Sequence, residues 1–161
     1  NSVNNQKNFI TLDKGSAQGV TTGMGVASST GVVGVVVGVS RNYSVVMSLL
    51  NTDFRLSASI ARNDYFGSLA WNGTNYRYAR LSEIPHHVRI NEGDTIVTSG
   101  YSAIFPAGLM AGTLTGEQER GGDFITLEVL LSADFKRLTN VYVIGNLTRK
   151  EREILEEEVP R

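Results

Sequence analysis

The amino-acid sequence predicts an all-β protein, built as a sandwich or as barrels. Its apolar runs are short, and turn residues separate them about every 8 to 14 positions, which is the spacing of consecutive strands. Valine, isoleucine, threonine and tyrosine, which favour strands, are frequent in these runs. The 161 residues include 17 glycines and 3 prolines, a composition that supports many tight turns rather than long helices.

Charge and cysteine content exclude several classes of function. The chain has 15 lysines and arginines against 16 acidic residues, for a net charge of −1, which argues against nucleic acid as the main partner, since such partners normally leave a clearly basic surface. It has no cysteine, which rules out disulfides, thiolate metal sites and a cysteine nucleophile. No apolar run approaches the length of a membrane-spanning helix and no signal peptide is visible. We expect this piece to be soluble alone. Whether a membrane anchor lies upstream stays an open question.

The first part of the chain predicts a polar start followed by five strands. Residues 1–8 are polar, and we expect them to be flexible. Strands are expected at 9–12, from Val26 onward, and at 32–39, 43–50 and 54–60. The last of these alternates apolar with polar residues, as a strand with one buried face does. The polar turn at 62–64 then marks the seam between two structural units.

Beyond this seam the sequence predicts a hairpin and a connector. Strands are expected at 66–71 and 74–81, and Asn72-Gly73 between them is the strongest hairpin signal in the chain. This pairing places Tyr76 and Tyr78 on one face of the returning strand. Residues 82–88 are expected to form a short connector, with Ser82 as a candidate helix cap.

The last part of the chain predicts two more strands and a tail. In the strand expected at 124–131, Ile125, Leu127, Val129 and Leu131 share one face, opposite Phe124 and Leu130. The final strand is expected at 141–144. Residues 148–161 are rich in charge, so we expect a charged C-terminal tail rather than a packed element.

The most distinctive stretch is 93–116, which reads GDTIVTSGYSAIFPAGLMAGTLTG. Two strands, at 95–98 and 110–115, flank an apolar loop whose Phe-Pro-Ala-Gly sequence suits a type I turn. A folded domain rarely leaves large apolar residues together on a loop unless a core or a partner covers them. The candidate partner-binding residues are therefore Tyr101, Ile104, Phe105 and Leu109, with Tyr76 and Tyr78 as a second group. Alternatively, Phe105 and Leu109 fill the mouth of a barrel.

Catalytic chemistry finds little support in the sequence. Its two histidines, His86 and His87, precede Asp94 and Ser132 in the chain order of trypsin-like proteases. However, no serine lies in a Gly-X-Ser-X-Gly frame, and Asp94 is better suited to accept backbone N–H groups of its own turn. The histidines and carboxylates have no metal-ligand spacing, so we expect neither metal nor cofactor.

The residues alone therefore indicate a binding or assembly module. Two alternatives stay open. One is a degenerate serine hydrolase on a double β-barrel, and the other is a carbohydrate-binding module that uses Trp71, Tyr76 and Tyr78.

The stretch GDTIVTSGYSAIFPAGLMAGTL resembles the signature region of the MreC family of rod-shape-determining proteins. Three landmarks occur in order: Gly93-Asp94, Thr98-Ser99-Gly100 and Phe105-Pro106-Ala107-Gly108-Leu109. The resemblance extends over about residues 8–147. It implies two small β-barrel subdomains in tandem, in a chymotrypsin-like double-barrel arrangement without proteolytic activity. We place them at 9–64 and 65–147, and assign the last two strands to the second barrel.

The resemblance also implies a function. It predicts a non-enzymatic scaffold of the bacterial cell-elongation machinery that controls cell shape and peptidoglycan synthesis. Its implied partners are the elongation transpeptidase, which is a penicillin-binding protein, other membrane proteins of the elongation complex, and further copies of itself in a homodimer or filament. The implied location is the extracytoplasmic (periplasmic) side of the inner membrane, with an anchor and coiled coil ahead of this segment.

Overall fold

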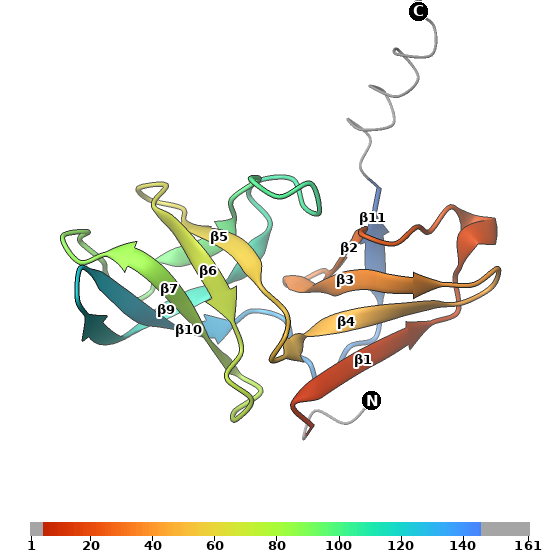
Figure 1. Ribbon diagram of the computed structural model, residues 1–161, viewed down its shortest axis with the longest axis horizontal. Coiled ribbons are helices and arrows are strands. Elements are labelled where there is room, and N and C mark those ends of the chain that lie inside the picture. The colour runs from red at the N-terminus through yellow and green to blue at the C-terminus, as the bar shows by residue number, and fades with distance from the viewer. Residues whose placement is uncertain (1–4, 146–161) are drawn as a thin grey trace, which may run out of the picture.

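The computed structural model describes residues 5–145 and contains two units that lie next to each other (Figure 1). One unit is a five-stranded sheet, and the other is a closed barrel of six strands. Within the described range, the regular structure consists of eleven strands and one turn of 3-10 helix. The prediction of an all-β protein is therefore confirmed.

The sheet has the strand order β1-β4-β3-β2-β11, and all of its pairs are antiparallel. Its strands are β1 (Lys7–Leu12), β2 (Gly25–Ser28), β3 (Val32–Val39), β4 (Ser44–Asn51) and β11 (Val141–Ile144), with the 3-10 turn η1 (Ser16–Gln18) between β1 and β2. Val26, Val36 and Val46 from three adjacent strands are fully buried on its inner face. Because β1 and β11 do not pair with each other, this unit stays open, and the first barrel that we expected does not close.

The barrel has the closed order β10-β7-β6-β5-β8-β9. Its strands are β5 (Leu56–Ile60), β6 (Phe66–Ala70), β7 (Tyr78–Pro85), β8 (Thr95–Thr98), β9 (Met110–Gly121) and β10 (Phe124–Leu131). The alternation predicted for β10 is confirmed, since Ile125, Leu127 and Val129 are buried inside while Phe124 and Leu130 are exposed. An antiparallel barrel that pairs every strand on both sides leaves no free strand edge.

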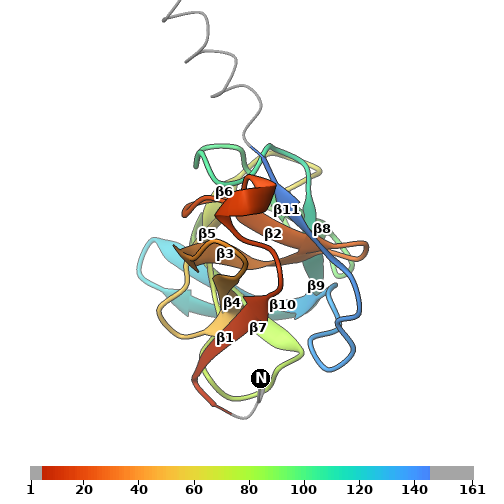
Figure 2. The same ribbon diagram turned by 90° about the vertical axis from the view of Figure 1, so that its right-hand side faces the viewer.

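The chain crosses between the two units twice (Figures 1 and 2). It enters the barrel through residues 52–55 and returns to the sheet through residues 132–140, where β11 pairs with β2. Two assignments were therefore wrong. β5, expected in the first unit, pairs with β6 and β8, and β11, expected in the second, completes the sheet. Order along the chain suggested both assignments, but hydrogen-bond pairing between distant segments decides them.

Smaller differences concern the ends of elements. Lys7 and Asn8 belong to β1 rather than to a flexible start, and the buried Asn8 donates from Nδ2 to the carbonyl oxygen of Leu50 at 2.6 Å. β7 continues through Ser82 as far as Pro85, so no connector or helix cap lies there. The predicted charged tail at 148–161 lies outside the described residues.

The contact between the two units is built on two glycines of the sheet. A side chain at Gly25 of β2 would collide with the ring of Phe105 from the barrel, and one at Gly31 would collide with Ser132 Oγ. Phe105 is only 3% exposed. The loop between β8 and β9 therefore fastens the barrel to the sheet.

Candidate functional site

The loop at 99–109 splits the predicted binding residues into two groups. Tyr101 is 74% exposed, the most exposed large hydrophobic side chain in the described part of the chain. Phe105 is buried against β2, while Ile104 and Leu109 are half-buried and pack on the core. Phe105 therefore holds the loop in place, and Tyr101 is the residue that the loop presents to solvent.

Hydroxyl groups of the Thr98-Ser99 landmark set the shape of this loop. Thr98 Oγ1 donates to the carbonyl oxygen of Pro106 at 2.6 Å and accepts from the backbone N–H of Leu109 at 2.9 Å. Ser99 Oγ accepts from the N–H of Tyr101 at 3.2 Å. Gly100 has φ of +81°, a conformation that glycine adopts without steric cost. These contacts give the landmark residues a structural task, which is to orient Tyr101.

Tyr101 continues into a larger exposed surface on the barrel. Its ring centroid lies 4.5 Å from that of Phe66, the first residue of β6. Phe124 of β10 lies opposite Pro85 of β7 in the strand register, on the other side of the same surface. We call Tyr65, Phe66, Tyr101 and Phe124 the aromatic patch; their exposed fractions are 40%, 49%, 74% and 50%. Solvent-exposed aromatic clusters of this kind mark contact surfaces.

An open groove of about 590 Å³ runs across this surface. Tyr65, Phe66 and Pro85 supply apolar lining. The polar lining comes from Arg55, Ser57, Ser68, Glu83 and Ser102. Aromatic walls with a few polar groups are typical of recognition sites.

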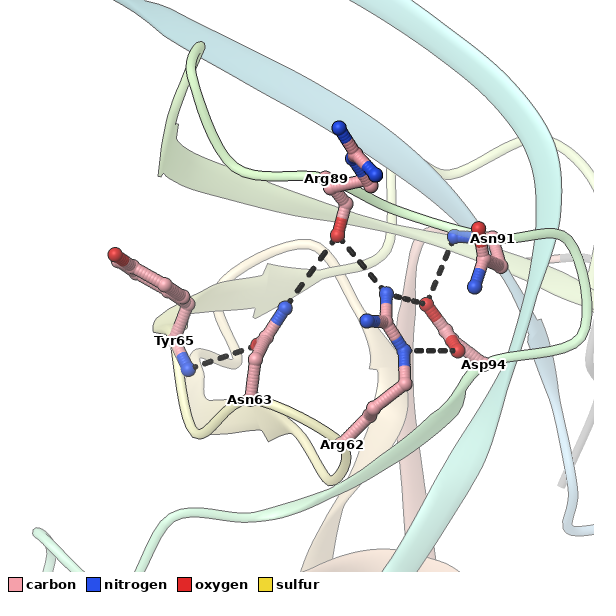
Figure 3. A network of polar contacts seen from close by, with 6 residues as sticks. All are labelled: Arg62, Asn63, Tyr65, Arg89, Asn91 and Asp94. Carbon is pink, nitrogen blue, oxygen red and sulfur yellow. Dashed lines mark hydrogen bonds and ion pairs between the residues drawn. The ribbon is translucent and has the colours of Figure 1, made fainter.

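A polar network supports the turn that carries Tyr65 (Figure 3). Arg62 donates from Nε to Asp94 Oδ1 at 3.1 Å and from Nη2 to Asp94 Oδ2 at 3.0 Å. The same Nη2 donates to the carbonyl oxygen of Arg89 at 2.9 Å. Asn63 Oδ1 accepts from the N–H of Tyr65 at 3.2 Å. The turn between β5 and β6 is thereby tied to the segment that precedes β8.

Asp94 is the centre of this network, and its side chain is only 9% exposed. The hydrogen bonds from Arg62 lower the pKa of Asp94, and the N–H of Asn91, which donates to Oδ2 at 2.8 Å, lowers it further against the opposing effect of burial. The predicted bond from Asp94 to its own turn is confirmed. Its bidentate pairing with Arg62, 32 positions away, was not predicted.

The second predicted group does not form an open platform. Trp71 is 2% exposed, and its Nε1 donates to the carbonyl oxygen of Asn75 at 2.9 Å. Tyr76 is half-buried, with Lys136 Nζ at 4.5 Å from its ring centroid. Tyr78 begins β7 and is also half-buried. Because Trp71 closes its own loop, it is not available to stack on a sugar.

The residues of the proposed serine hydrolase are not brought together. Asp94 is bound to Arg62, and His86 Nδ1 lies 3.4 Å from the carbonyl oxygen of Asp123. Ser132 Oγ is buried against Gly31 without a hydrogen-bond partner. Between residues 5 and 145, three or more metal-ligating side chains nowhere gather into a site. No helix in that range has the length and apolarity that crossing a membrane requires.

Tyr65, Phe66 and Phe124 were not predicted from the sequence as members of this surface. The alternation in β10 already predicted that Phe124 faces away from the core. A solvent-facing phenylalanine at the start of a strand is the signal that could have found it. Phe66 also opens its strand, β6, and its burial pattern alternates in the same way.

Comparison with known proteins gives consistent matches. The sequence model of the MreC family, described as rod shape-determining protein MreC, barrel core, matches residues 1–145. The cell shape-determining protein MreC of Listeria monocytogenes is 28% identical over 144 residues, which cover 87% of this chain and 49% of that protein. The chain thus spans about half the length of this relative.

Solved structures match in the same way. A crystal structure of MreC from Pseudomonas aeruginosa matches with a TM-score of 0.79 and 28% identity, over 89% of this chain and 91% of that one. A complex between penicillin-binding protein PBP2 and MreC from Helicobacter pylori contains a chain that matches with a TM-score of 0.60 and 22% identity, over 73% of this chain and 74% of that one. The second match, at this identity, indicates a shared fold.

Proposed function

The chain belongs to the MreC family of cell shape-determining proteins, and we propose that it acts as a non-enzymatic scaffold of the bacterial cell-elongation machinery. The family model covers all of the described residues. The observation that carries the proposal is the aromatic patch, an exposed surface of the kind that protein contacts use. A scaffold needs such a surface and needs no reactive centre.

The proposed partner is the elongation transpeptidase, a penicillin-binding protein, together with other membrane proteins of the elongation complex. Support comes from the Helicobacter pylori complex, in which an MreC chain of the same fold accompanies PBP2. We place the binding surface on the aromatic patch, in which Tyr101 is the most exposed ring. Bound there, the scaffold directs peptidoglycan synthesis from the extracytoplasmic side of the membrane, to which an N-terminal helix anchors the full-length protein.

Binding measurements with matched tyrosine variants test this proposal. The extracytoplasmic region of the transpeptidase from the same bacterium is titrated with the wild-type chain, Tyr101→Ala and Tyr142→Ala. Tyr142 is also exposed, at 59%, but lies on β11 of the sheet. Because a few aromatic residues contribute most of the affinity of an interface, we expect Tyr101→Ala to raise Kd by about tenfold or more. Equal loss in both variants, or in neither, would contradict the placement.

We further propose that the open sheet mediates self-association into a homodimer or filament. Its outer face exposes Phe9, Val37 and Val45, with Val45 opposite Thr11 of the edge strand β1. An open edge next to an apolar face favours strand addition by a second copy. Sedimentation over a range of concentrations should show association for the wild type and a monomer for Val37→Lys. Unchanged association of a folded Val37→Lys protein would move the contact elsewhere.

A further inference from the structure

Glu83 occupies an irregular position inside the groove of the aromatic patch. Ile84 and Leu81 of β7 lie opposite Ile125 and Leu127 of β10, so β7 has one extra residue between them. This bulge lets both Leu81 and Ile84 point into the core. Bulges commonly redirect a side chain, and they occur at barrel rims and next to functional sites.

The backbone at this bulge is strained. Glu83 has φ of +69°, and within the described residues only Asp64 shares a positive φ without being glycine. This conformation costs on the order of 1 kcal/mol for a side chain other than glycine or asparagine. The side chain of Glu83 makes no contact that offsets this strain, because it is exposed and its carboxylate takes part in none of the side-chain hydrogen bonds or ion pairs of residues 5–145.

Glu83 has no ion-pair partner among the described residues. Arg55 lines the same groove, but its Nη1 atom donates to the carbonyl oxygens of Thr52 at 2.7 Å and Phe54 at 2.9 Å. The guanidinium is thereby held by the connection between β4 and β5. The groove thus presents one free carboxylate beside the exposed ring of Phe66.

The closed barrel also restricts how a partner can bind here. β6 is paired with β5 over Phe66–Leu69 and with β7 over Ser68–Ala70, so where both sides are paired a partner backbone has no free edge to which it can add as a strand. Contact has to be made by inserted side chains. A planar guanidinium suits this groove best, since it can hydrogen-bond to a carboxylate while stacking on an aromatic ring, which a lysine ammonium does less well.

We propose that the groove receives an arginine side chain from an otherwise apolar segment of the docked transpeptidase, paired with Glu83 and stacked on Phe66. This inference rests on the proposed function, because it names the chemistry of the partner at that same surface. Charge complementarity at the free carboxylate, and not the area of the patch, selects this occupant. Neighbouring apolar residues of the segment cover the remaining aromatic rings.

The test uses the transpeptidase extracytoplasmic region as the probe and a pair of strain-matched variants. Glu83→Gly removes the carboxylate and relieves the positive φ, so the variant should melt at the same temperature as the wild type or higher. Asp64→Gly also removes a carboxylate and relieves a positive φ, but Asp64 lies in a turn and does not line the groove. We expect Kd to rise about tenfold or more for Glu83→Gly and for Glu83→Gln, and to stay within about twofold for Asp64→Gly.

Salt and charge reversal complete the test. Added salt should weaken wild-type binding more than binding by Glu83→Gln, since salt screens the attraction between the two opposite charges as they approach. Glu83→Arg should abolish binding, and a single Arg→Glu change in the transpeptidase should restore it.

Two failures can be told apart. If Tyr101→Ala weakens binding while both neutral Glu83 variants bind like the wild type, the docking surface stands and the arginine pairing is wrong. If the wild-type chain does not bind the transpeptidase at all, the proposed function is wrong and this inference falls with it.

Discussion

The closed barrel and the open sheet meet solvent in different ways. Every strand of the barrel is paired on both sides, whereas the sheet ends at β1 and β11. A partner can therefore reach the barrel only through side chains, such as those of the aromatic patch, while the sheet also offers free backbone groups. One short chain can thus separate two kinds of contact, with side-chain recognition on the barrel and strand addition at the sheet.

The largest expected effect concerns the residue that joins the two units. Phe105→Ala removes a buried ring from the contact with Gly25, and we expect the free energy of unfolding to fall by about 3 to 5 kcal/mol. Denaturation in urea, followed by circular dichroism, measures this change. Phe66→Ala is the matched control, because its half-exposed ring should cost about 1 kcal/mol or less.

The shape of that unfolding curve also tests how strongly the units depend on each other. If the barrel and the sheet are stabilised mainly by their contact, Phe105→Ala should still unfold in one transition at lower denaturant. A curve split into two transitions would mean that each unit is stable alone. A Phe105→Ala protein as stable as the wild type would contradict the anchoring role of the ring.

A smaller effect is expected from crowding between neighbouring strands. A Cβ at Gly67 of the barrel would collide with the carbonyl oxygen of Ser82, while at Gly38, in β3 of the sheet, it would make only an ordinary contact with Val45 at 3.8 Å. We expect Gly67→Ala to destabilise the protein by about 1 to 3 kcal/mol. Gly38→Ala should be neutral or stabilising by up to about 1 kcal/mol. Thermal melts of both variants give the comparison, and equal melting temperatures would show that barrel closure does not crowd β6 against β7.

Local pattern predicted most strands but could not predict how they pair. The alternation at 124–131 and the run at 95–98 coincide with β10 and β8, because side-chain period is a property of consecutive residues. The partner of a strand is not local. β11 pairs with β2, from the opposite end of the chain, and the two short apolar strands carry nothing in their own sequences that specifies each other.

The same limit applies to the candidate site. The exposure of Tyr101 follows from its place on a loop, and it was predicted. The burial of Phe105 on that same loop depends on Gly25, a residue on a distant strand of the other unit. The groove beside Glu83 depends on a bulge that appears only when β7 and β10 are paired. Features that arise from tertiary pairing leave no signal in the neighbouring sequence.

The smallest expected effect compares one ion pair from each unit. Arg62 and Asp94 on the barrel form a bidentate pair around a carboxylate that is 9% exposed, whereas Lys7 and Asp53 on the sheet form a pair whose side chains are 54% and 63% exposed. Asparagine keeps one acceptor oxygen but loses the charge, so Asp94→Asn should lower the free energy of unfolding by about 1 kcal/mol near neutral pH. Asp53→Asn should change it by about 0.5 kcal/mol or less, as exposed pairs contribute little.

Low pH should remove the difference in free energy of unfolding between the wild type and Asp94→Asn. Because folding lowers the pKa of Asp94 below its ordinary value of 3.8, the stabilisation is fully present above that value and is lost as the pH falls through the lowered pKa. The unfolding free energies of the two proteins, measured in urea at a series of pH values, should therefore converge as the pH drops below 3.8. A difference that stays constant down to acid pH would mean that Asp94 stabilises the barrel by its shape and not by its charge.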